Sequence, residues 1–319
     1  MKKNQIVKNK VVNFIHTLLL FSLLLVLMVL TGYLLAGGAG LIWAGFIGIF
    51  SLIATSGISP HIILKMYKAR PLSVAEAGGL YAIVHELAKR ANLPKIPELY
   101  YIPTRNLNAF SVGRQNNSAI GITDGLLRSL DMREVSAVLA HEISHIRSND
   151  MRVMGIADII SRITGFFSTV GQLLLLFNFP LIVVGSLAIS WTAIFILIFA
   201  PVLSGLLQLA ISRTREFNAD LDAARLTGDP EGLIVALKKM DYKQSGFFRR
   251  ILLPGRNDPN PSLLRTHPRT EERIERLRQL SEERYQPFFT DNYGSLISRD
   301  FPPEVLNRPR WRRFSGLWY

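Results

Sequence analysis

The sequence of 319 residues contains no cysteine. Disulfide bonds, thiolate metal sites and cysteine nucleophiles are therefore excluded, and any transition metal must be bound by histidine, aspartate or glutamate. Charged residues are also scarce, at 19% of the chain, whereas hydrophobic residues make up 49%. Because the apolar residues are concentrated in two stretches, the composition indicates a membrane protein rather than a soluble one.

Two long stretches contain no Asp, Glu, Lys or Arg. One has 54 residues, between Lys10 and Lys65, and the other has 50, between Arg162 and Arg213. A membrane-spanning helix needs about 20 apolar residues, so each stretch is long enough for two spans and a short connection. The breaks are expected at the glycines of 32–40 and at Asn178–Pro180. We therefore expect four transmembrane helices, over residues 12–30, 35–53, 163–177 and 181–211.

The third of these spans is the shortest and contains Gln172. It either begins earlier, near Met154, or enters the membrane without crossing it fully. We read the first stretch as an uncleaved hairpin, since its apolar run is too long for a signal peptide and a second run follows at once.

Basic residues flank the first pair of spans on both sides, and the connection between the spans carries no charge. They are Lys2, Lys3, Lys8 and Lys10 before the pair, and Lys65, Lys68 and Arg70 after it. Because Lys and Arg accumulate on the cytoplasmic side, we expect a multi-pass protein of the cytoplasmic (inner) membrane with both termini in the cytoplasm. The net charge of +13 is also explained by basic residues that accumulate on the cytoplasmic side, near anionic lipid. No basic face interleaved with aromatic residues indicates a nucleic-acid partner.

The remaining chain forms two soluble segments separated by the second apolar stretch. In the first, we expect a helix over 74–91, strands over 98–102, 108–112 and 118–123, the last two forming an antiparallel hairpin, and a helix from Asp131. Asp131 and Glu134 match a capping box at the start of that helix. In the second, we expect helices over 212–226, 230–244 and 268–283.

This pattern divides the chain into five parts. We expect a membrane hairpin over 1–64, the first part of a cytoplasmic domain over 65–162, and a second membrane hairpin over 163–211. The cytoplasmic domain resumes over 212–285, and a tail with no assigned role occupies 286–319.

The helix from Asp131 carries the motif His141-Glu142-Ile143-Ser144-His145. A spacing of four residues puts both imidazoles on one helix face, one turn apart, where they can bind a single cation. Glu142 can reach a metal-activated water without being a ligand, which suits a general base. The motif occurs by chance in roughly one chain of this length in a hundred, but here it lies on an amphipathic helix with no competing thiol chemistry.

A catalytic zinc needs a third protein ligand, because the fourth position is left for water or substrate. Glu216 and Asp220 lie four residues apart after the second apolar stretch. One can be the ligand, while the other accepts a hydrogen bond from a ligating histidine; alternatively, with Arg213 and Arg215, they form a solvated charge cluster. An even number of spans must separate the ligands if they are to meet on one side of the membrane, and the stretch fits two.

Five short segments follow one another along the chain, and the resemblance that they carry extends over about residues 10–280. They are Asn108-Ala109-Phe110, the motif 141–145, the run Ser-Arg-Thr-Arg-Glu-Phe-Asn-Ala-Asp over 212–220, His267-Pro268 and Glu272-Arg273-Ile274. In this combination the chain resembles the HtpX-type membrane zinc metallopeptidases, gluzincins related to the CAAX prenyl proteases. The segment that follows Phe110 and the tail after residue 286 depart from that resemblance.

The resemblance implies a role for each matching residue. His141, His145 and Glu216 would bind one zinc ion, Glu142 would be the general base, and Asp220 would orient a histidine ligand. Asn108, Ala109 and Phe110 would lie on an edge strand that binds extended substrate, and His267 would stabilise the oxyanion. Alternatively, Asn108 forms a turn, and His267 is an N-cap before Pro268.

We therefore expect a mainly helical integral membrane protein with four transmembrane helices and a gluzincin-like α+β domain that contains a small antiparallel sheet. By the same resemblance, it is a zinc metalloendopeptidase that cleaves misfolded membrane proteins or unfolded polypeptides in membrane protein quality control. Its expected partners are these substrates and the lipid bilayer. One alternative is a prenyl-protein endopeptidase, although those enzymes carry more than four spans. The other is a catalytically silent scaffold, which need not keep a general base such as Glu142.

Overall fold

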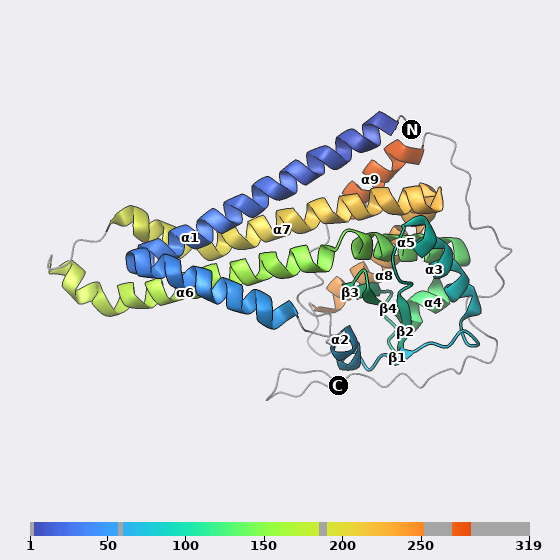
Figure 1. Cartoon of the computed structure of the whole chain (residues 1–319), viewed down its shortest axis with the longest axis horizontal. Helices are drawn as coiled ribbons and strands as arrows, with labels where there is room; N and C mark the ends of the chain where they lie inside the picture. The colour runs from blue at the N-terminus through green and yellow to red at the C-terminus, as the bar shows by residue number, and fades with distance from the viewer. Residues whose placement is uncertain (1–2, 57–59, 185–189, 252–269, 282–319) are drawn as a thin grey trace. The chain divides into compact units, whose positions relative to one another are not determined.

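The computed structural model describes residues 3–56, 60–184, 190–251 and 270–281. The chain divides into two compact units. Of the described residues, the helical unit contains 3–56, 152–184 and 190–214, and the mixed unit contains 60–151, 215–251 and 270–281. Figure 1 shows the long helices and the small sheet that distinguish the two units.

Three helices in the described part of the chain are long and apolar enough to span a membrane. They belong to α1 (Lys3–Ser56), α6 (Asp150–Val183) and α7 (Trp191–Thr227), and the corresponding apolar segments are Val11–Phe50, Asp150–Pro180 and Trp191–Thr227. The protein is therefore a membrane protein with a mainly helical fold, as its composition predicts.

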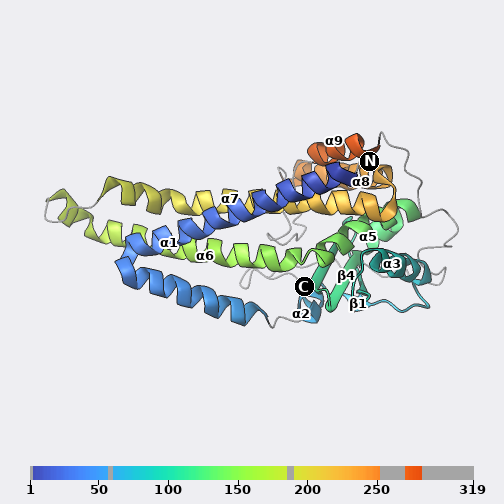
Figure 2. The same ribbon diagram turned by 45° about the horizontal axis from the view of Figure 1, so that its top comes forward.

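The longest of these segments is broken within the predicted glycine cluster. Ala36 and Gly37 have non-helical backbone angles, with a φ of +56° at Gly37. A side chain added at Gly40 would collide with the carbonyl oxygen of Gly32, so the chain folds back at this point, and Figure 2 shows the two arms of the resulting hairpin. An unbroken helix of 40 residues would be about 60 Å long, twice the thickness of the hydrocarbon core. The expectation of one span per arm, and of four spans in total, stays a prediction.

The second apolar stretch differs from expectation at its connection. The helix α6 already begins at Asp150 and continues through Pro180 to Val183, so the predicted break at Asn178–Pro180 is wrong. Pro180 has no backbone N–H and so removes the hydrogen bond to the carbonyl of residue 176, but it does not end the helix. Gln172 lies inside α6, and its side-chain amide donates a hydrogen bond to the carbonyl oxygen of Leu197 on α7, at 3.1 Å. This polar side chain is therefore satisfied within the helical unit.

The mixed unit is built on a four-stranded sheet with the strand order β1-β2-β4-β3. The strands are β1 (Arg70–Pro71), β2 (Glu98–Ile102), β3 (Ala109–Arg114) and β4 (Asn117–Thr123). The predicted β3–β4 hairpin is confirmed, but β2 pairs with β4 in parallel. The expectation of a purely antiparallel sheet is therefore wrong. The reason is burial: β4, with six of its seven residues buried, takes the central position between β2 and β3.

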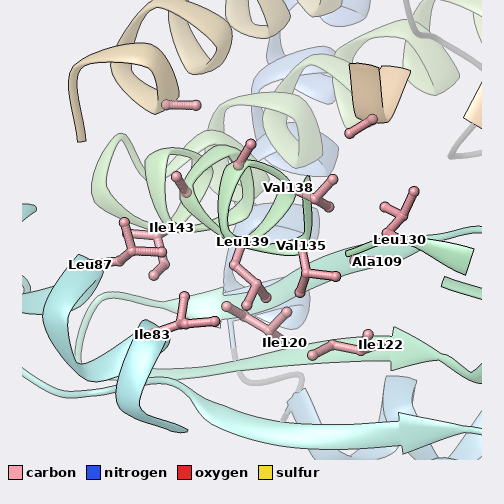
Figure 3. Close-up of a cluster of buried hydrophobic side chains, with 14 of the residues drawn as sticks. Ile83, Leu87, Ala109, Ile120, Ile122, Leu130, Val135, Val138, Leu139 and Ile143 are labelled. Carbon is pink, nitrogen blue, oxygen red and sulfur yellow. The ribbon is translucent and has the colours of Figure 1, made fainter. Parts of the chain in front are cut away.

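Helices cover both faces of this sheet. The helices α3 (Gly78–Arg90) and α5 (Met132–Arg147) pack on one face, where Ile83, Ile120 and Leu139 belong to one buried cluster (Figure 3). The short helix α2 (Pro60–Met66) covers the other face through Leu64. Beyond α5 lie α8 (Pro230–Ile251) and α9 (Thr270–Ser281), while α4 (Asp124–Ser129) links the sheet to α5.

The helix α5 begins at the predicted capping box. The side chain of Asp131 accepts a hydrogen bond from the backbone N–H of Glu134, and the Glu134 carboxylate accepts one from the N–H of Asp131. A capping box fixes where a helix starts, and the apolar face of α5 fixes how it lies on the sheet. Together they determine which face of α5 carries the two motif histidines.

Candidate metal centre

Three side chains of the mixed unit point their donor atoms at one place. His141 and His145 come from α5 and Glu216 comes from α7, and one ligand atom of each lies within 4.8 Å of the others. The two Nε2 atoms are 3.1 Å apart, and the Glu216 carboxylate oxygens lie 3.4 Å from His141 Nε2 and 3.6 Å from His145 Nε2. Zinc–ligand bonds of about 2.0–2.2 Å in a tetrahedron separate the ligand atoms by roughly 3.4 Å. The three residues therefore fit one small cation.

The second nitrogen of each histidine faces a carboxylate. His141 Nδ1 lies 3.0 Å from Asp220 Oδ1, and His145 Nδ1 lies 2.8 Å from Asp150 Oδ2. Because a carboxylate accepts hydrogen bonds, each Nδ1 carries a hydrogen, and in the neutral ring the lone pair is on Nε2. Asp220 was predicted to orient a histidine and lies where it can do so. Asp150, five residues after His145, had no predicted role.

The charges around the histidines also suit a divalent cation. The buried carboxylates Glu142, Asp150, Glu216 and Asp220 are accompanied by only two arginines, Arg215 and Arg273, among the residues that the structure describes here. Asp150 and Asp220 each bind one of these arginines directly. Imidazole and carboxylate groups gathered in a buried site are donors that a divalent cation such as zinc accepts.

Protons compete with the metal for this site. Burial lowers the pKa of His141, but hydrogen bonds to Asp220 and Glu216 raise it by a larger amount. The pKa of His141 is therefore raised to about 10. The pKa of His145 is also raised above its usual value, because the lowering by burial is smaller than the raising, to which the hydrogen bond to Asp150 contributes most. Since the metal-binding form of histidine is neutral, a metal must displace these protons, and its apparent affinity rises with pH.

Arg273 of α9 is a buried member of the site to which the sequence assigned no role. Its guanidinium donates to both oxygens of Asp220, at 2.6 and 2.8 Å, and its Nη1 lies 3.4 Å from Glu216 Oε2. In the sequence, Arg273 is one of several arginines in a Glu- and Arg-rich helix. Only its burial distinguishes it, with 6% of its surface exposed, and the local sequence does not predict that burial.

Replacing Arg273 with methionine should lower the free energy of unfolding of the metal-free protein by about 3–5 kcal/mol, because removing one partner of a buried ion pair leaves the other uncompensated. Denaturant unfolding in detergent, with and without zinc, measures the change. Zinc should restore part of the loss, since it supplies positive charge beside Glu216. Lysine at this position keeps the charge but cannot bind both oxygens of Asp220, so Arg273→Lys should be intermediate. A loss below 1 kcal/mol in Arg273→Met would contradict this account.

Glu142 lies between the metal site and the edge of the sheet. Its Oε2 accepts a hydrogen bond from the backbone N–H of Ser111, at 2.8 Å, and its side chain is buried. Ser111 is in β3, which is at one end of the strand order. The carboxylate of the predicted general base is therefore held by the edge strand on which substrate was expected to bind.

Two of the three residues expected to contact substrate, Ala109 and Phe110, have side chains in different buried clusters. Asn108 immediately precedes β3, and its backbone N–H donates to Thr123 Oγ1 at 3.0 Å. Ala109 faces the cluster below α5 (Figure 3), whereas the ring of Phe110 packs on the opposite face of the sheet, 4.9 Å from the ring of Tyr67. On the α5 side, Phe110 can therefore contribute only its backbone. The predicted oxyanion residue His267 and the tail over 286–319 lie outside the described residues.

The chain is similar to known proteins over most of its length. The profile of peptidase family M48 matches residues 75–281, which include all three candidate ligands. The chain is 36% identical over 277 residues to a protein named Protease HtpX homolog from Aquifex aeolicus, covering 81% of this chain and 89% of the relative. It is 35% identical over 301 residues to the protein of that name from Pyrococcus abyssi, covering 85% and 96%. A third relative of that name, from Campylobacter hominis, is 34% identical over 287 residues, covering 84% and 98%.

Among solved structures, the crystal structure of S. mikatae Ste24p aligns with 85% of this chain and 66% of its own, at 23% identity and a TM-score of 0.46. That likeness is too low to establish a shared fold. The sequence relatives do not depend on it, and the expected resemblance to HtpX-type proteins is confirmed by them. The chain belongs to peptidase family M48, as a membrane metalloprotease of the HtpX type.

Proposed function

We propose that this protein is a zinc-dependent endopeptidase in which His141, His145 and Glu216 bind the metal and Glu142 is the general base. The observation that carries the proposal is the convergence of these three ligands, with their donor atoms within 4.8 Å of one another. Two imidazoles and one carboxylate, with no thiolate in the chain, form a donor set used by catalytic zinc. Membership of a peptidase family supports the reaction type.

The chemistry divides between the metal and the protein. Zinc, when bound, acts as a Lewis acid that activates water at neutral pH and polarises the scissile carbonyl. Glu142 accepts the proton of the attacking water and then delivers it to the leaving amine, so no covalent intermediate with the protein forms. The Ser111 N–H holds the carboxylate of Glu142 at 2.8 Å, and Asp220 orients His141. We assign oxyanion stabilisation to His267, as the resemblance implies.

The substrate, on this proposal, is an extended segment of a misfolded membrane protein. The strand β3 is at the edge of the sheet, and a sheet edge binds extended peptide by main-chain hydrogen bonds without demanding one sequence. The candidate membrane helices keep the enzyme in the bilayer where such substrates occur. We place it in the cytoplasmic membrane with its site and termini on the cytoplasmic side, because the basic flanks of the first hairpin favour that orientation.

Cleavage of an unfolded membrane protein by the purified full chain in liposomes tests this proposal. We expect fragments to accumulate with zinc present, to stop forming after chelation, and to form again when zinc is returned. A prenylated peptide serves as the comparison substrate. Selective cleavage of that peptide would identify a prenyl-protein endopeptidase instead, and no cleavage of either substrate with zinc bound would indicate a scaffold.

A further inference from the structure

We propose that Asp150 and Arg215 form a positioning pair that fixes the imidazole of His145 for metal binding. The inference rests on the proposed metal centre. It assigns a role to two residues that are neither ligands nor acid–base groups. The feature that matters is the carboxylate oxygen that Asp150 offers to His145, and Arg215 fixes that carboxylate in place.

Asp150 reaches His145 because the chain reverses just after α5. The helix ends at Arg147, and Asn149 adopts a left-handed conformation with a φ of +51°. Asparagine tolerates this conformation better than most residues. The reversal makes Asp150 the first residue of α6 and directs its carboxylate back to His145 Nδ1, at 2.8 Å. Asp150 is only 4% exposed, so water does not replace this contact.

Arg215 holds the other oxygen of the same carboxylate. Its guanidinium donates through Nε and Nη2 to Asp150 Oδ1, and Nη2 also donates to the carbonyl oxygen of Ser148, at 3.2 Å. Thus Oδ1 faces the arginine and Oδ2 faces the histidine. Arginine has no acceptor atom, so Arg215 cannot itself orient an imidazole that donates from Nδ1. It acts on His145 through Asp150.

The other histidine has the same arrangement, built from different elements. Asp220 contacts His141 Nδ1 at 3.0 Å and also accepts two hydrogen bonds from Arg273. Each candidate histidine ligand is therefore backed by one aspartate that is itself fixed by one arginine. A repeated constellation at two ligands is difficult to explain as an incidental ion pair. It is the arrangement expected where imidazole orientation controls metal binding.

The pair also joins the helices α6 and α7. Asp150 opens α6, and Arg215 precedes Glu216 on α7. One ion pair therefore holds both helices at His145 and Glu216. An ion pair with a purely structural role would occupy the same position, so the test separates ligand positioning from simple charge pairing.

Zinc affinity of the purified full-length protein, measured by competition with a chromophoric chelator, is the readout. We expect Asp150→Ala to weaken zinc binding by about 10- to 100-fold, the usual cost of losing a partner that orients a ligand. Asp150→Asn keeps an oxygen acceptor for His145 and should lose less than about tenfold. The double variant Asp150→Arg with Arg215→Asp restores opposite charges but not the acceptor, so its zinc affinity should stay as low as that of Asp150→Ala.

The matched control is Asp229→Ala. Asp229 is a buried aspartate paired with Arg133 in the same unit, and we find no contact between it and the three candidate ligands among the described residues. Its loss should lower stability and leave zinc affinity unchanged. If Asp150→Ala does not fold, the comparison between Asp150→Asn and the charge swap decides the question.

Four results would overturn the proposal. Wild-type zinc affinity in Asp150→Ala, or its recovery in the charge swap, would refute the positioning pair alone, provided that the wild type binds zinc and cleaves substrate. A wild type that binds no zinc, or a His145→Ala variant that binds it as tightly, would refute the metal centre and the pair together. The two failures are therefore distinguishable within one set of proteins.

Discussion

Replacing Glu142 with glutamine is expected to lower the cleavage rate by about 100- to 10,000-fold, the usual contribution of general acid–base catalysis, and to leave zinc bound. Glutamine has nearly the shape of glutamate, and its oxygen can still accept the hydrogen bond from the Ser111 N–H. The edge strand therefore keeps its place. What the variant loses is the ability to take a proton from water.

Zinc content by elemental analysis and initial cleavage rates, measured on the same preparations, test this expectation. Glu142→Asp is the informative companion, since it keeps a carboxylate but withdraws it by one methylene from the reacting water. It should retain more activity than glutamine. Full activity in Glu142→Gln would show that another group is the base, and loss of zinc would show that Glu142 acts on the metal itself.

Replacing Glu216 with alanine is expected to release zinc. Glu216 is the sole carboxylate among the three candidate ligands, and its oxygens lie 3.4 and 3.6 Å from the two imidazoles. Without it, two neutral nitrogens remain, which is one ligand fewer than catalytic zinc sites use. The loss of affinity should exceed the roughly 10- to 100-fold cost of removing an outer hydrogen-bond partner, and proteolysis should disappear with the metal.

The control for this variant is Asp222→Ala on the same helix. Asp222 is also buried, and its carboxylate lies 3.8 Å from Arg147 and 3.7 Å from Arg225. It does not belong to the group of candidate ligands. It should keep its zinc. Unchanged zinc content in Glu216→Ala would reject this residue as a ligand and leave the third position to be found elsewhere.

Features set by neighbouring residues were predictable from the sequence. The start of α5 follows from Asp131 and Glu134, which satisfy each other's backbone N–H groups within one turn. The shared face of His141 and His145 follows from helix geometry. The β3–β4 hairpin follows from two short apolar runs with polar residues between them. Each of these signals lies within a few residues of the structure that it predicts.

Features set by distant contacts were not predictable in this way. The parallel pairing of β2 with β4 depends on which strand is most completely buried, which is decided by packing on both faces. A separate helix was expected over 212–226, but α7 runs unbroken from Trp191 to Thr227. The charges that begin at Arg213 mark where an apolar segment ends, and charge does not end a helix.

The residues of the candidate site also divide into those set by neighbouring residues and those set by distant contacts. Asp220 could be proposed because it lies four residues from Glu216, one turn along a helix. Asp150 and Arg273 act through tertiary contacts, one by a chain reversal at Asn149 and one by burial of a helix that otherwise looks exposed. For Asp150, its place just beyond the end of the helix that carries the two histidines is a usable sequence signal. No comparable local signal identifies Arg273.

Zinc K-edge X-ray absorption on the purified full-length protein tests the central claim most directly. The account predicts one zinc per chain, with two imidazole ligands and carboxylate or water oxygens at about 2.0–2.2 Å. One imidazole should be lost in His145→Ala. Absence of stoichiometric zinc, or a zinc environment without imidazole, would contradict it.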